Sequence, residues 1–338
     1  MEGFTHDGEF VLVAEDGAND LKNYPVKCVN GRIWVNNHAH VLQGKAGIAN
    51  NSFLAFDISQ SDIESLLVGG GRAKLNAETL MSIEFRLPCL QEQFRIGKYL
   101  TQLDRLITLH QRKYDKLTNV KKSMLEKMFP KNGSNVPEIR FKGFTEAWEQ
   151  RKLGDNIIEY TETTTKNNQY PPLTSSRKGI FLQTEYFAGN QIASDDNTGY
   201  NIVPYGYFTY RHMSDDEIFH FNINDIVENG IVSTLYPVFT TDENLDSRYL
   251  QYQLNYGYEF AKFAILQKQG GSRTYMYLNK LKQLYLTMPK SVEEQNAISA
   301  FFMSLDNLIT LHQRKPSCYQ FKLDNERITK STSLFSSS

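Results

Sequence analysis

The longest regular pattern of apolar positions in the chain is helical and covers residues 92–128. Apolar side chains recur there at alternating intervals of four and three, the a/d pattern of a coiled coil. The predicted seam consists of Ile96, Leu100, Leu103, Ile107, His110, Tyr114, Leu117, Lys121, Met124 and Met128. A helix of this length, at ~1.5 Å per residue, forms a rod of roughly 55 Å.

The first part of this helix occurs a second time in the chain. Residues 92–113, EQFRIGKYLTQLDRLITLHQRK, align with residues 294–315, EQNAISAFFMSLDNLITLHQRK, at a constant offset of 202, and 13 of 22 positions are identical. This spacing indicates a duplicated module, not a solenoid. The second copy is predicted to pair with the first through Ile298, Leu305, Ile309 and His312. Pro316 should end the second helix, and the serine-rich residues after it are expected to be disordered.

Strand patterns dominate the block before the first helix. EFVLVAEDG reads as a strand, and YPVKCV and GRIWV read as two strands joined by an Asn30-Gly31 hairpin,. WVNNHAHVLQ alternates with period two, and residues 53–68 have a helical pattern. MSIEFRLP is predicted to be a last strand that stops at Pro88.

The second block has short predicted strands at residues 181–182, 205–210, 217–221 and 230–239, followed by a helix over 248–267. LKQLYLTMP then matches LMSIEFRLP of the first block. The duplication therefore extends upstream of the helix, in the order helix, glycine break, strand, proline, helix. Each block is expected to be a mixed α/β domain that leads into a long helix.

Composition and charge narrow the class of protein. With 338 residues, 40% hydrophobic and 22% charged, the chain is expected to form about two globular domains,. No secretory signal or membrane span is predicted. The net charge of −1 argues against general polyanion binding, but residues 95–131 are strongly basic,. Cys28, Cys89 and Cys318 have no metal-like or redox-like spacing,.

Several stretches resemble the specificity subunit of type I restriction–modification systems. They are VPEIRFKGFTEAWEQRKLGD, YPPLTSSRKGIFLQTEYF, WVNNHAHVL and the repeated helix, which is similar to the conserved spacer of that family. The resemblance implies two target-recognition domains that each read half of a split DNA site, separated by long antiparallel coiled-coil helices. It also implies a subunit without catalysis of its own, which directs methyltransferase and motor-nuclease subunits on double-stranded DNA. No cofactor is expected, and the scattered cysteines indicate reduced thiols in a cytoplasmic protein,.

On this basis the chain is divided into five parts. Residues 1–91 are a partial first recognition domain, 92–130 the first spacer helix, 131–289 the second recognition domain, 290–315 a shortened second helix and 316–338 a divergent tail. The family pattern is thus incomplete in the first domain and in the second helix. A truncated, rearranged or phase-variable product is the corresponding hypothesis.

Candidate DNA contacts are polar and basic residues in loops, because such residues bind phosphates and read base edges. The glycine-containing segments 69–72 and 270–273 lack the Lys-Ser/Thr of a P-loop, and a simple helix-ending turn is the alternative. Surface charge alone is the alternative for Arg177-Lys178 and Tyr210-Arg211. The candidates are Asn36, Asn37, His38, His40, Arg72, Lys74, Arg177, Lys178, Tyr210, Arg211, Gln269, Gly270, Gly271, Ser272, Arg273, Thr274 and Tyr275.

Catalytic and metal sites are not predicted. Tyr170-Pro171-Pro172-Leu173 lacks the leading Asp or Asn and the closing aromatic residue of an amino-methyltransferase signature,. His38 and His40 have no third ligand at a suitable spacing. One rival hypothesis is a stand-alone nuclease or methyltransferase. The other is a degenerate fragment that binds the methyltransferase subunit and no longer reads DNA.

Overall fold

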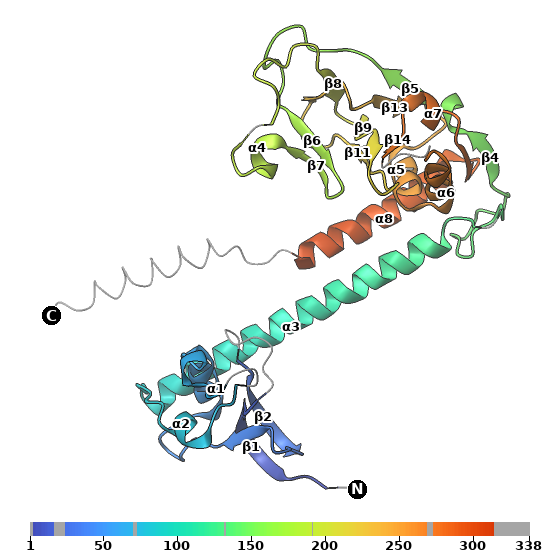
Figure 1. Cartoon of the computed structure of the whole chain (residues 1–338). Helices are drawn as coiled ribbons and strands as arrows, with labels where there is room; N and C mark the ends of the chain where they lie inside the picture. The colour runs from blue at the N-terminus through green and yellow to red at the C-terminus, as the bar shows by residue number, and fades with distance from the viewer. Residues whose placement is uncertain are drawn as a thin grey trace. The chain divides into compact units, whose positions relative to one another are not determined.

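The computed structural model describes residues 3–16, 24–69, 73–131, 133–190, 192–268 and 273–313 (Figure 1). The chain divides into two compact units, Met1–Lys113 and Tyr114–Ser338. The division falls within the long helix α3 (Leu90–Lys127), which contributes to both units. Both units combine strands with helices, which confirms the predicted mixed α/β class.

The first unit is a three-stranded antiparallel sheet covered by helices. Its elements are β1 (His6–Ala14), β2 (Val26–Ile33), β3 (Ala39–Leu42), α1 (Asn51–Gln60), the 3₁₀ turn η1 (Glu64–Leu66), α2 (Ala77–Met81) and the N-terminal part of α3, with strand order β2-β1-β3. Val11 and Val13 of β1 are fully buried and share a core with Ile58 of α1 and Leu75. The alternation of β1 places these valines on one face of the sheet.

Two sequence predictions for this unit are wrong. Asn30-Gly31 makes no hairpin, because β2 continues through it and Gly31 lies opposite Gly8 in the ladder with β1. Both glycines have positive φ, so they absorb a local distortion inside two long strands,. MSIEFRLP forms no strand, because the described part of the chain places no neighbouring strand beside residues 84–87.

The helix predicted over residues 53–68 is shorter than expected. α1 begins at Asn51, where the Asn50 side chain accepts a hydrogen bond from the Phe53 N–H, and it ends at Gln60,. The rest of the predicted helix contains only η1. The apolar residues Ile63, Leu66 and Leu67 therefore reach the core from a turn and not from a helix face.

The second unit contains a four-stranded antiparallel sheet in the order β11-β9-β13-β5, surrounded by strand pairs and helices (Figure 1). Its strands are β4 (Glu149–Lys152), β5 (Ile157–Tyr160), β6 (Leu173–Ser176), β7 (Gly179–Leu182), β8 (Asn201–Pro204), β9 (Phe208–Tyr210), β10 (Met213–Ser214), β11 (Phe221–Ile223), β12 (Asn229–Val232), β13 (Val238–Thr241), β14 (Thr274–Tyr275) and β15 (Tyr285–Met288). Its helical elements are η2 (Leu153–Asp155), α4 (Gln183–Tyr186), α5 (Ser247–Tyr256), α6 (Tyr258–Leu266), α7 (Leu278–Leu281) and α8 (Val292–Gln313). Fully buried aromatic rings fill the core, among them Phe208, Phe221, Phe239, Tyr249 and Phe302.

The predicted elements of this unit exist, but several are divided or displaced. Residues 230–239 form two strands, β12 and β13, and the 248–267 helix is interrupted at Gly257 between α5 and α6. A Cβ at Gly257 would lie 2.3 Å from the Gln253 carbonyl oxygen, so the close approach at this break requires glycine. Residues 217–220 precede β11 and do not belong to it.

α3 has nearly the predicted extent, and α8 is described as far as Gln313, so its predicted end at Pro316 and the tail predicted after it lie outside the described residues. Part of the predicted pairing of the two helices is visible within the second unit. Lys121 of α3 forms an ion pair with Asp306 of α8, and Phe129 stacks on Phe302 with ring centroids 6.0 Å apart. The two helices are therefore antiparallel here, because the residue numbers along α3 rise as those along α8 fall. Among the helices that the structure describes, none is both long and apolar enough to span a membrane.

The two units share a structural plan that identifies equivalent positions. The order β2-β1-β3 followed by α1 corresponds to β11-β9-β13 followed by α5. Asn50 caps α1 as Asp246 caps α5. Gln93 of α3 accepts from the Asn50 N–H, and Gln295 of α8 accepts from the Asp246 N–H at 2.8 Å. The duplication therefore includes the α/β blocks that precede the helices as well as the helices themselves.

Candidate nucleic-acid interface

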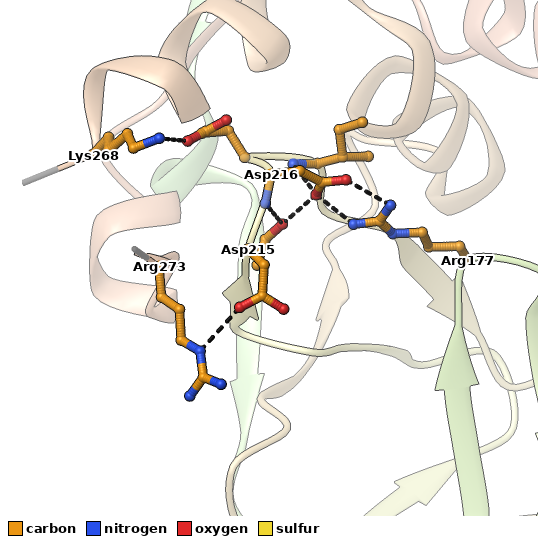
Figure 2. Close-up of polar contacts among 8 residues, drawn as sticks. Arg177, Asp215, Asp216, Lys268 and Arg273 are labelled. Atoms are coloured by element: carbon orange, nitrogen blue, oxygen red, sulfur yellow. Dashed lines mark hydrogen bonds and ion pairs between the residues drawn. The ribbon is translucent and has the colours of Figure 1, made fainter. Parts of the chain in front are cut away.

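Three consecutive acidic residues follow β10 and bind three basic side chains from separate segments (Figure 2). Asp216 binds Arg177 from the β6–β7 turn. Asp215 binds Arg273, which precedes β14, and Glu217 binds Lys268, which follows α6. We call residues 215–217 the acidic turn. The β10–β14 pairing holds the acidic turn next to Arg273, since Ser214 lies opposite Thr274.

The Arg177–Asp216 pair has bidentate geometry. Arg177 Nη1 donates to Asp216 Oδ2 at 2.8 Å, and Nη2 donates to Oδ1. Ser214 Oγ donates to the same carboxylate at 2.8 Å. The Arg177 guanidinium, followed by the Ser214 hydroxyl, holds the pKa of the Asp216 carboxyl well below its usual range. Both ions remain charged at neutral pH, and the pair fixes the plane of the guanidinium at the surface.

Arg273 and Lys268 stand on either side of the glycine loop. Arg273 Nε donates to Asp215 Oδ1 at 2.9 Å, and the Arg273 side chain is 52% exposed. The predicted contacts Gln269, Gly270, Gly271 and Ser272 lie outside the described residues. The acidic turn thus orients the basic residues at both ends of this loop.

A cleft of about 280 Å³ lies beside the acidic turn, lined by Arg177, Arg211, His220 and Tyr236 among others. Arg211 is exposed and makes no ion pair within the described ranges, and the same is true of Lys178 in the β6–β7 turn. These two cations are available to an anionic ligand without first leaving a carboxylate. The sequence prediction included Arg211 and Lys178 but could not distinguish them from the basic residues that form ion pairs.

Two other predicted contacts of this domain lie in its interior. Tyr210 is fully buried, and its hydroxyl donates to the Met276 carbonyl oxygen at 2.9 Å. Thr274 is 1% exposed, whereas Tyr275 is 37% exposed and stacks near Tyr277 at 5.9 Å. Sequence reasoning missed Tyr277, which is 48% exposed and also stacks on His212. The sequence contained one signal for Tyr277, because it is an aromatic residue two positions after Tyr275.

A related arrangement occurs in the first unit. Glu15 and Asp16 follow β1, and Lys74 Nζ lies 3.4 Å from Glu15 Oε1 and 3.6 Å from Asp16 Oδ2. Lys74 follows the first glycine loop, as Arg273 follows the second, and Arg72 lies outside the described residues. Each unit therefore places acidic residues that follow a strand against a basic residue that comes after the glycines: two carboxylates for Lys74 and one, Asp215, for Arg273.

The predicted histidines of the first unit have separate partners. His38 Nδ1 is 3.0 Å from Asp16 Oδ1, and His40 Nε2 donates to the Leu75 carbonyl oxygen at 2.7 Å. The Asn36 side chain accepts from the His38 N–H, and Asn37 is exposed. In the part of the chain that the structure describes, no group of three or more His, Cys, Asp or Glu side chains is arranged to hold a metal.

The predicted seam residues differ in exposure. Ile298 and Leu305 of α8 are buried in the second core, and Leu117 of α3 packs against it. Ile96, Leu100, Leu103 and Tyr114 are half-buried, as are Ile309 and His312, while Ile107 and His110 are exposed. The predicted seam residues are therefore packed against the second core at the C-terminal end of α3, whereas those in the middle of the helix are exposed or half-buried.

The chemistry of these surfaces is that of hydrogen-bond donors, cations and aromatic faces. Such groups bind phosphates, pair with base edges and stack on bases. The acidic turn keeps two guanidinium groups in fixed positions, which is a requirement for bidentate recognition.

Comparison with known proteins gives a consistent result. Residues 2–119 match the family described as type I restriction modification DNA specificity domain. A type I restriction enzyme specificity subunit from Haemophilus influenzae is 42% identical over 106 residues, which is 31% of this chain and 27% of that protein. The MjaVIII specificity subunit of Methanocaldococcus jannaschii is 24% identical over 86% of this chain and 77% of its own length.

The fold agrees with a solved structure as well. The type I restriction–modification S subunit from M. genitalium superposes with a TM-score of 0.57 and 12% sequence identity, covering 98% of this chain and 83% of that one. The chain spans about a quarter of the Haemophilus influenzae relative and most of the other two proteins. Residues 2–119 are therefore similar to the DNA specificity domain of type I restriction–modification systems, and the chain as a whole resembles an S subunit of these systems in its fold.

Proposed function

We propose that this chain is the DNA sequence-recognition subunit of a type I restriction–modification complex. It reads a bipartite site in double-stranded DNA and directs adenine methylation and cleavage by methyltransferase and motor-nuclease subunits, with no catalysis of its own. The supporting observation is the duplication: two recognition cores, each with carboxylates set against a basic residue beside a glycine loop, are attached to copies of the same helix. The cytoplasm is the compartment where such a complex would meet DNA.

The proposed readers in the second domain are the exposed cations around the acidic turn. Arg177 and Arg273 are held with part of each guanidinium engaged and about half of each side chain exposed. Lys178 and Arg211 have no carboxylate partner among the residues described. Oriented arginines suit base edges in the major groove, and unpaired cations suit phosphates.

The test is co-expression with the cognate methyltransferase subunit, followed by mapping of methylated adenines in genomic DNA. A bipartite motif is the expected result. A palindrome built from one half-site would show that two chains act together. Absence of any motif, with an intact complex of the two subunits, would exclude the proposal.

A second candidate function is a subunit that binds the methyltransferase but no longer reads DNA. The observation in its favour is that Lys74, Arg177, Lys268 and Arg273 all have carboxylate partners, which reduces the positive charge offered to DNA. A gel shift on random DNA, with and without the methyltransferase subunit, separates the two functions. Retained subunit association without a shift would support this candidate.

A further inference from the structure

The N-terminal end of α8 holds an arginine and a tryptophan from the segment that follows α3. Arg140 Nε and Nη2 donate to the two oxygens of Glu294 at 2.7 and 2.8 Å, and Trp148 Nε1 donates to Glu294 Oε1 at 3.1 Å. Glu294 is 2% exposed and Trp148 is 3% exposed. This carboxylate therefore fixes the connecting segment to the second core.

A second contact joins the same segment to α8 and α5. Lys121 of α3 pairs with Asp306, and its Nζ lies 5.6 and 5.0 Å from the ring centroids of Tyr252 and Tyr256. Tyr252 Oη also donates to Asp306 at 2.7 Å. The lysine is thus enclosed by one carboxylate and two aromatic faces, which is a favourable site for a cation.

A third contact is made by backbone. β4 forms an antiparallel pair with β15, in which Glu149 lies opposite Met288 and Lys152 opposite Tyr285. Residues 114–152 therefore attach to the second unit through a lysine, an arginine–tryptophan pair and a strand.

The duplication places an equivalent of each acceptor in the first unit. Glu92 corresponds to Glu294 and Asp104 to Asp306, at the offset of 202. α1 corresponds to α5 through the caps Asn50 and Asp246, which makes Phe56 and Gln60 the counterparts of Tyr252 and Tyr256. Residues 84–87 correspond to β15.

These equivalents are unoccupied in the described part of the first unit. Glu92 is exposed, and its side chain has no hydrogen-bond or ion-pair partner among the residues that the structure describes. Phe56, Gln60 and Asp104 line an open groove of about 1060 Å³ between α1, β2 and α3. Within residues 84–87 only Phe85 is half-buried and the others are exposed, and in the described ranges their backbone N–H groups have no backbone acceptor.

We infer that this surface of the first unit, formed by Glu92, the groove at Asp104 and the unpaired segment at residues 84–87, binds a separate polypeptide segment with the chemistry of residues 114–155. That segment would be a helix with a lysine at the position of Lys121, followed by an arginine, a tryptophan and a short strand. Backbone pairing of the short strand with residues 84–87, as β4 pairs with β15, supplies affinity, and the charged and aromatic contacts select the partner,. A second copy of this chain fits this surface less well, because residues 114–155 of that copy are already bound to its own Glu294 and Asp306.

A binding measurement with the full chain tests this inference. The probe is a fluorescently labelled polypeptide of residues 114–155, titrated with the protein and followed by anisotropy. Saturable 1:1 binding is expected, and Glu92→Gln should weaken it about tenfold, since it removes charged hydrogen bonds. Asp104→Asn should weaken it as well, and Glu78→Gln, at an exposed position of α2 in the same unit, is the matched control.

Changes in the probe provide a reciprocal test. Arg140→Ala in the polypeptide should cause a loss similar to that of Glu92→Gln, and the two changes combined should add little. Lys116→Ala, at an exposed position, is the control. Amide hydrogen exchange at residues 84–87 should slow when the probe binds.

Three results would overturn the inference. They are no saturable binding, equal binding by the Glu92→Gln and Glu78→Gln proteins, and a homodimer that depends on Glu92 and excludes the probe. Glu294→Gln should leave binding unchanged, so a loss there would show that the probe displaces the chain's own segment from the second unit. DNA is not involved in any of these measurements, which separates this inference from the proposed function.

Discussion

A buried glutamine joins each repeated helix to the domain before it. Gln93 Nε2 donates to the carbonyl oxygens of Ile48 and Pro88, both at 2.9 Å, while Gln295 Nε2 donates to those of Asn244 and Pro289. Both side chains are almost completely buried, and each amide uses both N–H groups and its oxygen in hydrogen bonds within its unit,. The glutamine at the start of each repeat is therefore a structural connector.

The neighbouring glutamates offer a matched comparison of stability. Glu294→Gln removes the charge opposite Arg140, whose side chain is only 13% exposed. We expect the free energy of unfolding of the second unit to fall by about 2 kcal/mol, because a largely buried cation loses its partner. Glu92→Gln, at the equivalent exposed position, should change stability by less than about 0.5 kcal/mol. Urea unfolding followed by tryptophan fluorescence reports on Trp148 in the second unit and on Trp34 in the first, and equal effects of the two changes would contradict this account.

Single residues also distinguish the cations of the proposed DNA surface. Arg211→Ala and Lys178→Ala remove charges that no carboxylate neutralises in the described structure, so each should weaken DNA binding by about 1 kcal/mol or more,. Lys282→Ala removes a lysine paired with Glu159 at 2.8 Å and serves as the control. Fluorescence anisotropy with a duplex carrying the mapped motif measures all three, and no difference from the control would place the DNA surface elsewhere.

At the scale of elements, the crossing of α3 and α1 depends on one glycine. A Cβ at Gly97 would lie 2.9 Å from the Phe53 backbone nitrogen and 3.0 Å from Asn50 Oδ1, the capping atom of α1. Gly97→Ala improves helix propensity by about 1 kcal/mol, but it forces the two helices apart and disturbs the cap. We expect a net loss of stability of about 1–3 kcal/mol in the first unit.

The control for this change is Gln102→Ala, at an exposed position of the same helix. It should be neutral or slightly stabilising, since only propensity changes. Thermal unfolding of both variants measures the difference. A Gly97→Ala protein as stable as the control would show that α1 moves away from α3 at no cost.

The helices could be predicted from sequence better than the strands. α3 has a regular apolar repeat over ten turns, and its hydrogen bonds are local, so its limits need no knowledge of the rest of the chain. A strand requires a partner, which the local sequence does not specify. MSIEFRLP and LKQLYLTMP have similar patterns, but only the latter becomes a strand, because β4 lies beside it.

The candidate site was predictable only as a set of residue types. Arg177, Arg211 and Arg273 were selected as basic loop residues, yet nothing local indicates that residues 215–217 bind two of them. Tyr210 is of a residue type expected at a DNA contact, but it lies in the core because β9 is central in its sheet. Pairing of side chains from distant segments is a property of the fold, and the sequence pattern does not contain it.

At the scale of the whole molecule, charge is distributed unevenly despite a net value of −1. The middle of α3 carries exposed cations at Arg105, Arg112 and Lys116. The carboxylate nearest to Arg105 in the sequence is that of Asp104. Two interpretations remain for this basic face. It is either the solvated flank of a coiled coil or a surface that follows the phosphate backbone between two half-sites.

Salt dependence separates these interpretations, because each phosphate contact contributes about −0.9 to the slope of log K against log salt concentration. If the face contacts DNA, the triple change Arg105→Ala, Arg112→Ala and Lys116→Ala should reduce the slope by about 2–3 while leaving the methylated motif unchanged, since phosphate contacts carry no sequence information. The measurement is a salt titration of binding to a duplex with the mapped site, for the chain in complex with its methyltransferase subunit. An unchanged slope would assign the cations to solvation of the helix, and a changed motif would mean that α3 takes part in reading the bases.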